Sequence, residues 1–121
     1  MAVTKDIMID GKTVRFRASA AVPRMYRLKF GRDMFHDMGT LSDEFQGDEI
    51  GVASLEIFEN VAYIFAKHAD PEGVPETPDE WLENFDMFSI YQVLPELMDL
   101  WGSNLRESAE GKKRAAQPAG K

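Results

Sequence analysis

Apolar and polar residues alternate over residues 13–17 near the N-terminus, and the preceding short segment, 5–9, ends in three apolar residues and reads as the partner strand. Alternation with a period of two is typical of a β-strand that buries one face and exposes the other. The dipeptide Asp10-Gly11, which lies between the segments, is a strong signal for a tight hairpin turn. We therefore predict a β-hairpin over residues 5–18. Because a two-stranded hairpin is only marginally stable alone, it must pack on helices or add strands from another copy of the chain.

From residue 20 onward the apolar residues recur at spacings of three and four, which is typical of helices. Gly31 interrupts the first of these patterns at a cost of roughly 1 kcal/mol against Ala, and we attribute it to the close approach of another backbone. Thr77, Pro78 and Glu80 together predict a capped helix start. Pro95 predicts a kink or a restart within the last helix. The predicted helices cover about 20–40, 48–68, 78–85 and 87–105.

These elements predict an α+β fold that is mainly α, with an N-terminal β-hairpin followed by about four helices. The length of 121 residues suits one domain with a single hydrophobic core. We place the folded domain at residues 1–105. Residues 106–121 contain no large apolar side chain and are rich in Gly, Lys, Ala and Pro. We expect this segment to be a flexible, disordered basic tail.

The composition argues against several kinds of function. The chain has no cysteine, so it forms no disulfide and no thiolate metal site, which favours a reducing compartment. It has no run of roughly 18 apolar residues, so we expect no membrane-spanning segment and no membrane partner. The first residues lack the apolar core of a signal peptide.

Charge is unevenly distributed along the chain, whose net charge is −7. Residues 1–40 carry eight basic and four acidic side chains, residues 41–110 carry two and 17, and residues 111–121 carry four and none. Such an acidic centre would repel nucleic acid, so we expect no nucleic-acid partner. Two interpretations of the asymmetry remain open. The charges belong to solvated helix faces, or basic and acidic surfaces meet between subunits and support self-association.

Few residues suggest chemistry of their own. Asp33, His36 and Asp37 lie close together on the first predicted helix, in a spacing that a metal site can use. Arg32 lies beside them, and we favour the alternative of a solvated polar face. We interpret His68, at the end of the second predicted helix, as a cation at the negative end of the helix dipole. Because the chain has no phosphate-binding loop, Ser/His pairing or HExxH spacing, we predict no catalytic, cofactor-binding or metal-binding residue, and no enzyme.

The first predicted helix carries two apolar stripes. Its main face is assigned to the core and contains Tyr26, Phe30, Met34, Met38 and Leu41. The second stripe, Met25, Leu28 and Phe35, is left over, and we predict that it binds a partner. The alternative is that it packs in the core or on a neighbouring copy. Arg24 and Arg27 are three residues apart and therefore neighbours on the helix, where they are either solvated or paired with acids on another subunit.

Several motifs occur in a characteristic order along the chain. They are Ile9-Asp10-Gly11-Lys12, Tyr26-Arg27-Leu28-Lys29-Phe30-Gly31-Arg32-Asp33, Leu55-Glu56-Ile57-Phe58-Glu59-Asn60, Pro78-Asp79-Glu80-Trp81-Leu82 and Leu100-Trp101-Gly102-Ser103-Asn104. This series covers residues 7 to 105 and resembles the tail assembly chaperones of long-tailed, siphovirus-type bacteriophages and prophages of Gram-positive bacteria. The run 105–110 departs from the Thr/Ser-rich segment that such chains carry before their lysines.

The resemblance implies a non-catalytic morphogenesis factor without cofactors. Such proteins bind and solubilise the long, helical tape measure protein and help to recruit tail tube subunits. They act in the host bacterial cytoplasm and are absent from the mature virion. Many have a longer form, made by ribosomal frameshifting, and the expected slippage region here is Gly111-Lys112-Lys113, unless these residues are simply part of a basic tail. The rival function is that of an unrelated small helical adaptor or regulator.

Overall fold

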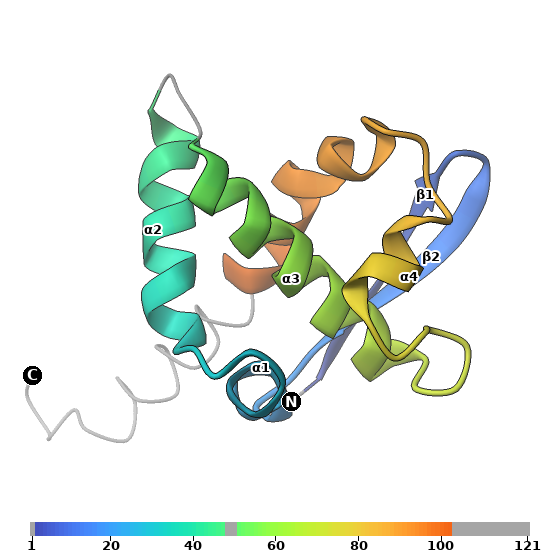
Figure 1. Ribbon diagram of the computed structural model, residues 1–121, viewed down its shortest axis with the longest axis horizontal. Coiled ribbons are helices and arrows are strands. Elements are labelled where there is room, and N and C mark those ends of the chain that lie inside the picture. The colour runs from blue at the N-terminus through green and yellow to red at the C-terminus, as the bar shows by residue number, and fades with distance from the viewer. Residues whose placement is uncertain (1, 48–50, 103–121) are drawn as a thin grey trace, which may run out of the picture.

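The protein is α+β and mainly helical, as the sequence predicts (Figure 1). The computed structural model describes residues 2–47 and 51–102. The elements are β1 (Val3–Ile9), β2 (Lys12–Ala18), α1 (Ala21–Phe30), α2 (Met34–Gln46), α3 (Val52–Ala69), α4 (Pro78–Leu82) and the 3-10 helix η1 (Ser89–Val93). Helical backbone then covers residues 94–102, which we call the C-terminal helical segment.

The predicted hairpin is confirmed, and it begins at Val3, slightly before the predicted start. Ile9 pairs with Lys12 across the turn, and Asp10 and Gly11 both have positive φ, 53° and 76°. Positive φ at both central residues is the requirement of a type I′ turn, whose twist matches that of the strands. One face of the hairpin is buried, as the alternating pattern predicts; its buried residues are Ile7, Ile9, Phe16 and Ala18.

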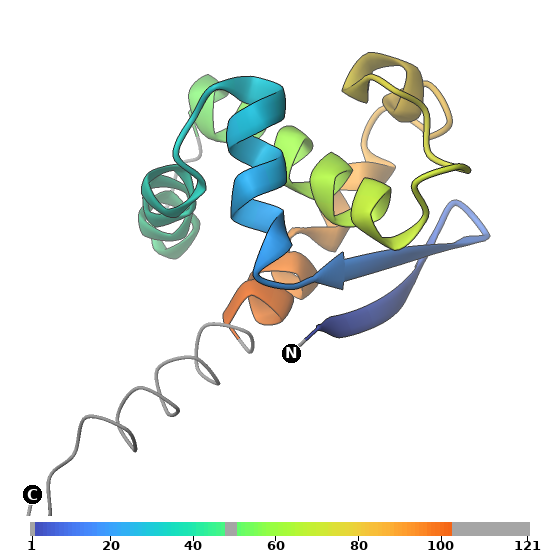
Figure 2. The same ribbon diagram turned by 90° about the horizontal axis from the view of Figure 1, so that it is seen from below.

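Helix α3 is the centre of the molecule. It packs against β2, α1, α2 and α4, and Figures 1 and 2 show it between α2 on one side and α4 on the other. Residues 61–66 are all buried, because neighbouring elements cover every side of this part of the helix. A helix that is apolar around most of its circumference belongs in the core. The predicted core helix 48–68 is therefore confirmed, with its first helical residue at Val52 and with residues 48–50 outside the described residues.

The prediction of one helix over residues 20–40 is wrong, because the chain turns at Gly31 and forms two helices. Gly31 has a left-handed conformation with φ 67°, and its N–H donates to the carbonyl of Arg27 at 2.8 Å. This is the αL cap that commonly ends a helix. A Cβ at Gly31 would meet nothing within 4 Å, so glycine is needed for the backbone conformation and not for a close approach. Asp33 then caps α2 by accepting a hydrogen bond from the N–H of Phe35 at 3.0 Å.

Helices α1 and α2 consequently point in different directions. Figure 1 looks down α1, whereas α2 lies across the view. Helix α2 continues past the predicted end to Gln46, and its cap is Gly47. Both helices nevertheless bury the apolar positions that the periodicity assigns to the core: Tyr26, Met34, Met38 and Leu41 are buried, and Phe30 is half-buried against them.

The capped start of α4 is confirmed. The hydroxyl of Thr77 accepts a hydrogen bond from the N–H of Glu80 at 3.2 Å and donates one to the Glu80 carboxylate at 3.0 Å. This is a variant of the capping box, in which the Glu80 carboxylate accepts its hydrogen bond from the Thr77 hydroxyl and only the Thr77 side chain bonds the backbone. Helix α4 ends at Leu82, short of the predicted residue 85.

The prediction of one helix over residues 87–105 is also corrected. The 3-10 helix η1 comes first, and Pro95 is the second residue of the C-terminal helical segment that follows. Proline is tolerated in the first turn of a helix, where its missing N–H costs nothing, so the predicted restart is confirmed. The end of the predicted helix, 103–105, and the predicted tail, 106–121, lie outside the described residues.

Candidate interaction surface

A buried carboxylate joins the two helices on either side of the Gly31 turn. Asp37 on α2 is only 1% exposed. Its carboxylate accepts hydrogen bonds from Nε and Nη2 of Arg32 at 2.7 and 2.8 Å, and from the hydroxyl of Tyr26 at 2.8 Å. A two-pronged contact between guanidinium and carboxylate is geometrically specific. The network therefore holds α1, the connecting turn and α2 in one arrangement.

The network also changes the acidity of its members. The hydrogen bonds from Arg32 lower the pKa of Asp37, against the opposing effect of burial, and the Tyr26 hydroxyl lowers it further. Burial, together with the Asp37 carboxylate, raises the pKa of Tyr26. The predicted solvated face of Asp33, His36 and Asp37 is therefore wrong for Asp37, which is a buried structural anion. Asp33 is the cap of α2, and only His36 is a plain exposed side chain.

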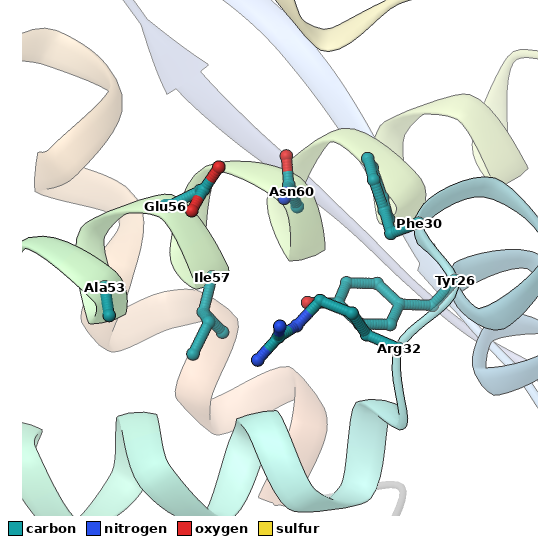
Figure 3. Close-up of a pocket in the computed structure, with 7 residues that line it drawn as sticks. All are labelled: Tyr26, Phe30, Arg32, Ala53, Glu56, Ile57 and Asn60. Carbon is teal, nitrogen blue, oxygen red and sulfur yellow. The ribbon is translucent and has the colours of Figure 1, made fainter.

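A pocket of about 260 Å³ lies between α1 and α3, and we call it the α1–α3 pocket (Figure 3). Arg32 reaches into it from the connecting turn, and Glu56 and Asn60 line it from α3. Within the described parts of the chain, neither the Glu56 carboxylate nor the Asn60 carboxamide has a hydrogen-bond or ion-pair partner. The remaining lining side chains are Tyr26, Phe30, Ala53 and Ile57.

Several large apolar side chains are exposed. Leu28 is 69% exposed, Phe35 57%, Met87 78% and Phe88 71%. Two members of the predicted partner-binding stripe, Leu28 and Phe35, are thus accessible to a partner. The third, Met25, is half-buried against the core and contributes less surface than predicted.

The predicted stripe is not continuous, because Leu28 lies on α1 and Phe35 on α2. The ring of Phe35 packs on that of Trp101, with centroids 5.5 Å apart and an interplanar angle of 55°. Arg24 and Arg27 are exposed on α1 beside Leu28, and neither forms an ion pair with a described residue. The predicted residues therefore divide into an α1 surface with two arginines and an aromatic pair on α2 and the C-terminal helical segment.

The loop that carries Met87 and Phe88 is tied to the tip of the hairpin. The carboxylate of Asp10 accepts hydrogen bonds from the N–H of Asp86 at 2.8 Å and from the hydroxyl of Ser89. The bond from Ser89, followed by that from Asp86, lowers the pKa of Asp10. The apolar pair is thus held on backbone that is fastened on both sides. Sequence reasoning missed it, because it assigned Asp10 only to the turn and placed residue 87 at the start of a predicted helix.

His68 does not have the predicted role. Its Nε2 lies 2.8 Å from the hydroxyl oxygen of Ser19, which accepts a hydrogen bond from the N–H of Ala21 at 3.2 Å. Burial lowers the pKa of His68, and the nearby charge of Arg17 lowers it further, so the imidazole is mainly neutral at pH 7. Its contribution is to join the end of α3 to the start of α1.

Comparison with protein-family models, with curated proteins and with solved structures found no match. Over residues 2–47 and 51–102, no helix combines the length and the apolar character needed to cross a bilayer. In the same ranges, no three His, Asp or Glu side chains gather where they would hold a metal ion. The candidate functional features of the described chain are therefore the exposed apolar side chains and the α1–α3 pocket.

Proposed function

We propose that this protein is a tail assembly chaperone, which keeps a helical tape measure protein soluble in the host bacterial cytoplasm and does not remain in the virion. The observation that carries the proposal is the display of large apolar side chains on a small helical body, above all Met87 and Phe88 on the loop that is hydrogen-bonded to Asp10. The ordered motifs from Ile9 to Asn104 add the resemblance to this class of protein.

The physical requirement on such a chaperone is to cover apolar helix faces that water cannot solvate favourably. An unassembled tape measure helix exposes contiguous apolar stripes, and such patches promote aggregation. A fastened apolar pair contacts a stripe at a lower entropic cost than a flexible one, because little of its freedom remains to be lost. The net charge of −7 then keeps the complex dispersed.

Many weak contacts along one long filament also favour self-association of the chaperone, because neighbouring copies bind the same chain and gain avidity. We propose that basic α1 and the acidic centre of the sequence contribute to contacts between copies. Raising the salt concentration should then weaken the assembly in sedimentation experiments, since ions screen exposed charges. A monomer at high protein concentration and low salt would contradict this part of the proposal.

Coexpression with the tape measure protein of the same phage or prophage tests the function directly. We expect the chaperone to raise the soluble yield of that protein. The paired changes Met87→Ser/Phe88→Ser should reduce the gain, and so should Leu28→Ser/Phe35→Ser. The matched control is Gln92→Ser, an exposed polar change in η1, close in sequence to the fastened loop.

Two outcomes contradict different parts of the proposal. If the wild-type chain does not raise the soluble yield, the chaperone function is wrong. If both folded double variants match the wild type, the function stands and the assigned apolar surfaces are wrong. Circular dichroism establishes that each variant is folded before its yield is compared.

We further propose a longer, frameshifted form that recruits the tail tube protein. The expected slippage region, Gly111-Lys112-Lys113, lies outside the described residues. Adjacent lysine codons can place a run of adenines in the message, on which tRNAs re-pair after slipping. The nucleotide sequence decides the matter: codons without such a run, or the lack of an overlapping downstream frame, would end this part of the proposal.

A further inference from the structure

We propose that the α1–α3 pocket binds one basic side chain, a lysine or an arginine, of a helical protein partner, with Glu56 as the counter-ion. The identity of that partner as a tape measure protein rests on the proposed function. The preference of the pocket for a basic side chain is independent of the proposed function, because it follows from the size, the walls and the charges of the cavity.

The size of the pocket favours a single side chain over a whole small molecule. Its volume is about 260 Å³, below the range of roughly 300 to 1,000 Å³ in which pockets for drug-sized ligands usually lie. The walls combine apolar groups with a polar end: Ile57 and Phe30 supply carbon surface, while Glu56 and Asn60 supply oxygen atoms. A long aliphatic stem with a cationic tip matches this arrangement, because lysine and arginine bury their stems and keep the charged head hydrogen-bonded.

The charges of the pocket select a cation. Glu56 is exposed at the mouth of the pocket and has no ion-pair partner among the described residues, so its negative charge is free to attract a cation. Helix α1 ends at Phe30, which lines the pocket, and the last carbonyl groups of a helix carry partial negative charge. A cation placed in the pocket is therefore attracted by a full and by a partial negative charge.

Arg32 also lines the pocket, but its charge is already matched. Its guanidinium donates two hydrogen bonds to buried Asp37, at 2.7 and 2.8 Å, and this pair is neutral as a unit. An anionic ligand would have to compete with Asp37 for Arg32 while lying beside Glu56. That competition is unfavourable, because breaking the pair would leave a buried carboxylate without its partner.

The surroundings indicate a helical partner. Val52 lies four residues before Glu56, so the two share a face of α3, and Val52 is 84% exposed. A partner helix that covers Val52 with an apolar residue can place a basic residue, one turn away, over the pocket. This spacing of anchors is the usual form of helix recognition by a groove.

Small analogues of the two side chains test the pocket without any protein partner. We suggest titrating n-butylammonium, n-propylguanidinium and, as the anionic control, butyrate into isotopically labelled full-length protein while recording two-dimensional NMR spectra. The expected result is saturable shifts for the side-chain amide of Asn60 and the methyl groups of Ile57, caused by one or both cations and not by butyrate. In Glu56→Gln the affinity should fall about tenfold, because glutamine keeps an acceptor oxygen but lacks the negative charge that strengthens a hydrogen bond from a cation. Glu83→Gln, which removes an exposed charge outside the pocket, should leave it unchanged.

Four results would overturn the proposal. The first two are the lack of saturable shifts with either cation and equal shifts with butyrate. The others are an unchanged affinity in Glu56→Gln and pocket shifts that depend on protein concentration alone, which would assign the pocket to a second copy of the chain. The spectra themselves show whether each variant is folded. Coexpression of Glu56→Gln with the tape measure protein separates the two proposals. Cation binding without an effect on soluble yield would place the pocket outside the chaperone function, whereas failed titrations with an intact yield would leave that function standing.

Discussion

The substitution Asp37→Asn tests whether the buried network holds α1 and α2 together. Asparagine has nearly the same size as aspartate, but it lacks the negative charge and presents an NH₂ group in place of one oxygen. The wild-type carboxylate accepts two hydrogen bonds from Arg32 and one from Tyr26, all between 2.7 and 2.8 Å. In the variant, one Arg32 donor faces another donor, and the remaining bonds lose their charge assistance.

The magnitude follows from these contacts. A hydrogen bond to a charged group contributes about 1.5 to 3 kcal/mol, and breaking a fully buried pair costs about 3 to 5 kcal/mol. The Asp37 side chain is 2% exposed, but that of Arg32 is 54% exposed, so water solvates the released guanidinium and offsets part of the loss. We therefore expect Asp37→Asn to lower the free energy of unfolding by about 2 to 3 kcal/mol at pH 7.

The effect should disappear in acid, and the sign follows from the pKa shift. Arg32, supported by Tyr26, lowers the pKa of Asp37 in the folded state. The stabilisation is therefore fully present above the pKa of the unfolded state, about 3.9, and is lost as the pH falls through the lower folded value. Wild type and Asp37→Asn should differ by the full amount at pH 7 and at pH 5, should begin to converge below about pH 4, and should converge fully only below the folded-state pKa.

Urea unfolding followed by tryptophan fluorescence at pH 7, 5 and 3 measures this difference. The matched control is Asp33→Asn on the same helix, which keeps an N-cap residue of similar strength and should change stability by less than about 0.5 kcal/mol. A loss in Asp37→Asn below 0.5 kcal/mol at pH 7, or an equal loss at pH 3, would refute the assigned role of the network.

The remaining predictions concern the backbone and the core. Gly31→Ala should destabilise by about 1 to 2 kcal/mol because Ala resists the left-handed conformation, whereas Gly39→Ala, inside α2 with nothing within 4 Å, should stabilise by about 0.5 to 1 kcal/mol. Thermal unfolding checks both, and equal effects would contradict the reading of the turn. Phe58→Ala should destabilise by about 3 to 5 kcal/mol, while Phe88→Ala, 71% exposed, should stay within about 0.5 kcal/mol. Trp101→Ala should fall between them because Trp101 is half-buried, and an unchanged melting temperature for Phe58→Ala would remove that residue from the core.

The local elements of this protein are determined by its sequence. Asp10-Gly11 specifies a type I′ turn, because these two residues tolerate positive φ at both positions. Thr77 and Glu80 specify the start of α4 through short-range hydrogen bonds. In each case the interacting groups lie within a few residues of each other, so the physics that forms the element is contained in a short window.

The break at Gly31 was decided by the tertiary structure. The apolar spacing of Tyr26, Phe30, Met34 and Met38 continues through the break, and a glycine in a helix costs only about 1 kcal/mol, too little to end a helix by itself. Turning the chain there lets both helices pack on α3 and brings Asp37 to Tyr26. Periodicity describes a face and not a direction, so it cannot distinguish one long helix from two that bury the same residues.

The candidate surfaces were decided by the tertiary structure for the same reason. Asp10 fastens the loop that displays Met87 and Phe88, through hydrogen bonds to residues 76 and 79 positions away. The α1–α3 pocket is lined by residues from different elements, with Arg32 from the connecting turn and Glu56 from α3. The pattern of the sequence identifies which residues are apolar and roughly how many the core needs. Which of these apolar side chains remain exposed depends on how the whole chain packs. A side chain is buried by residues that surround it in space, and many of those residues are far away in the sequence.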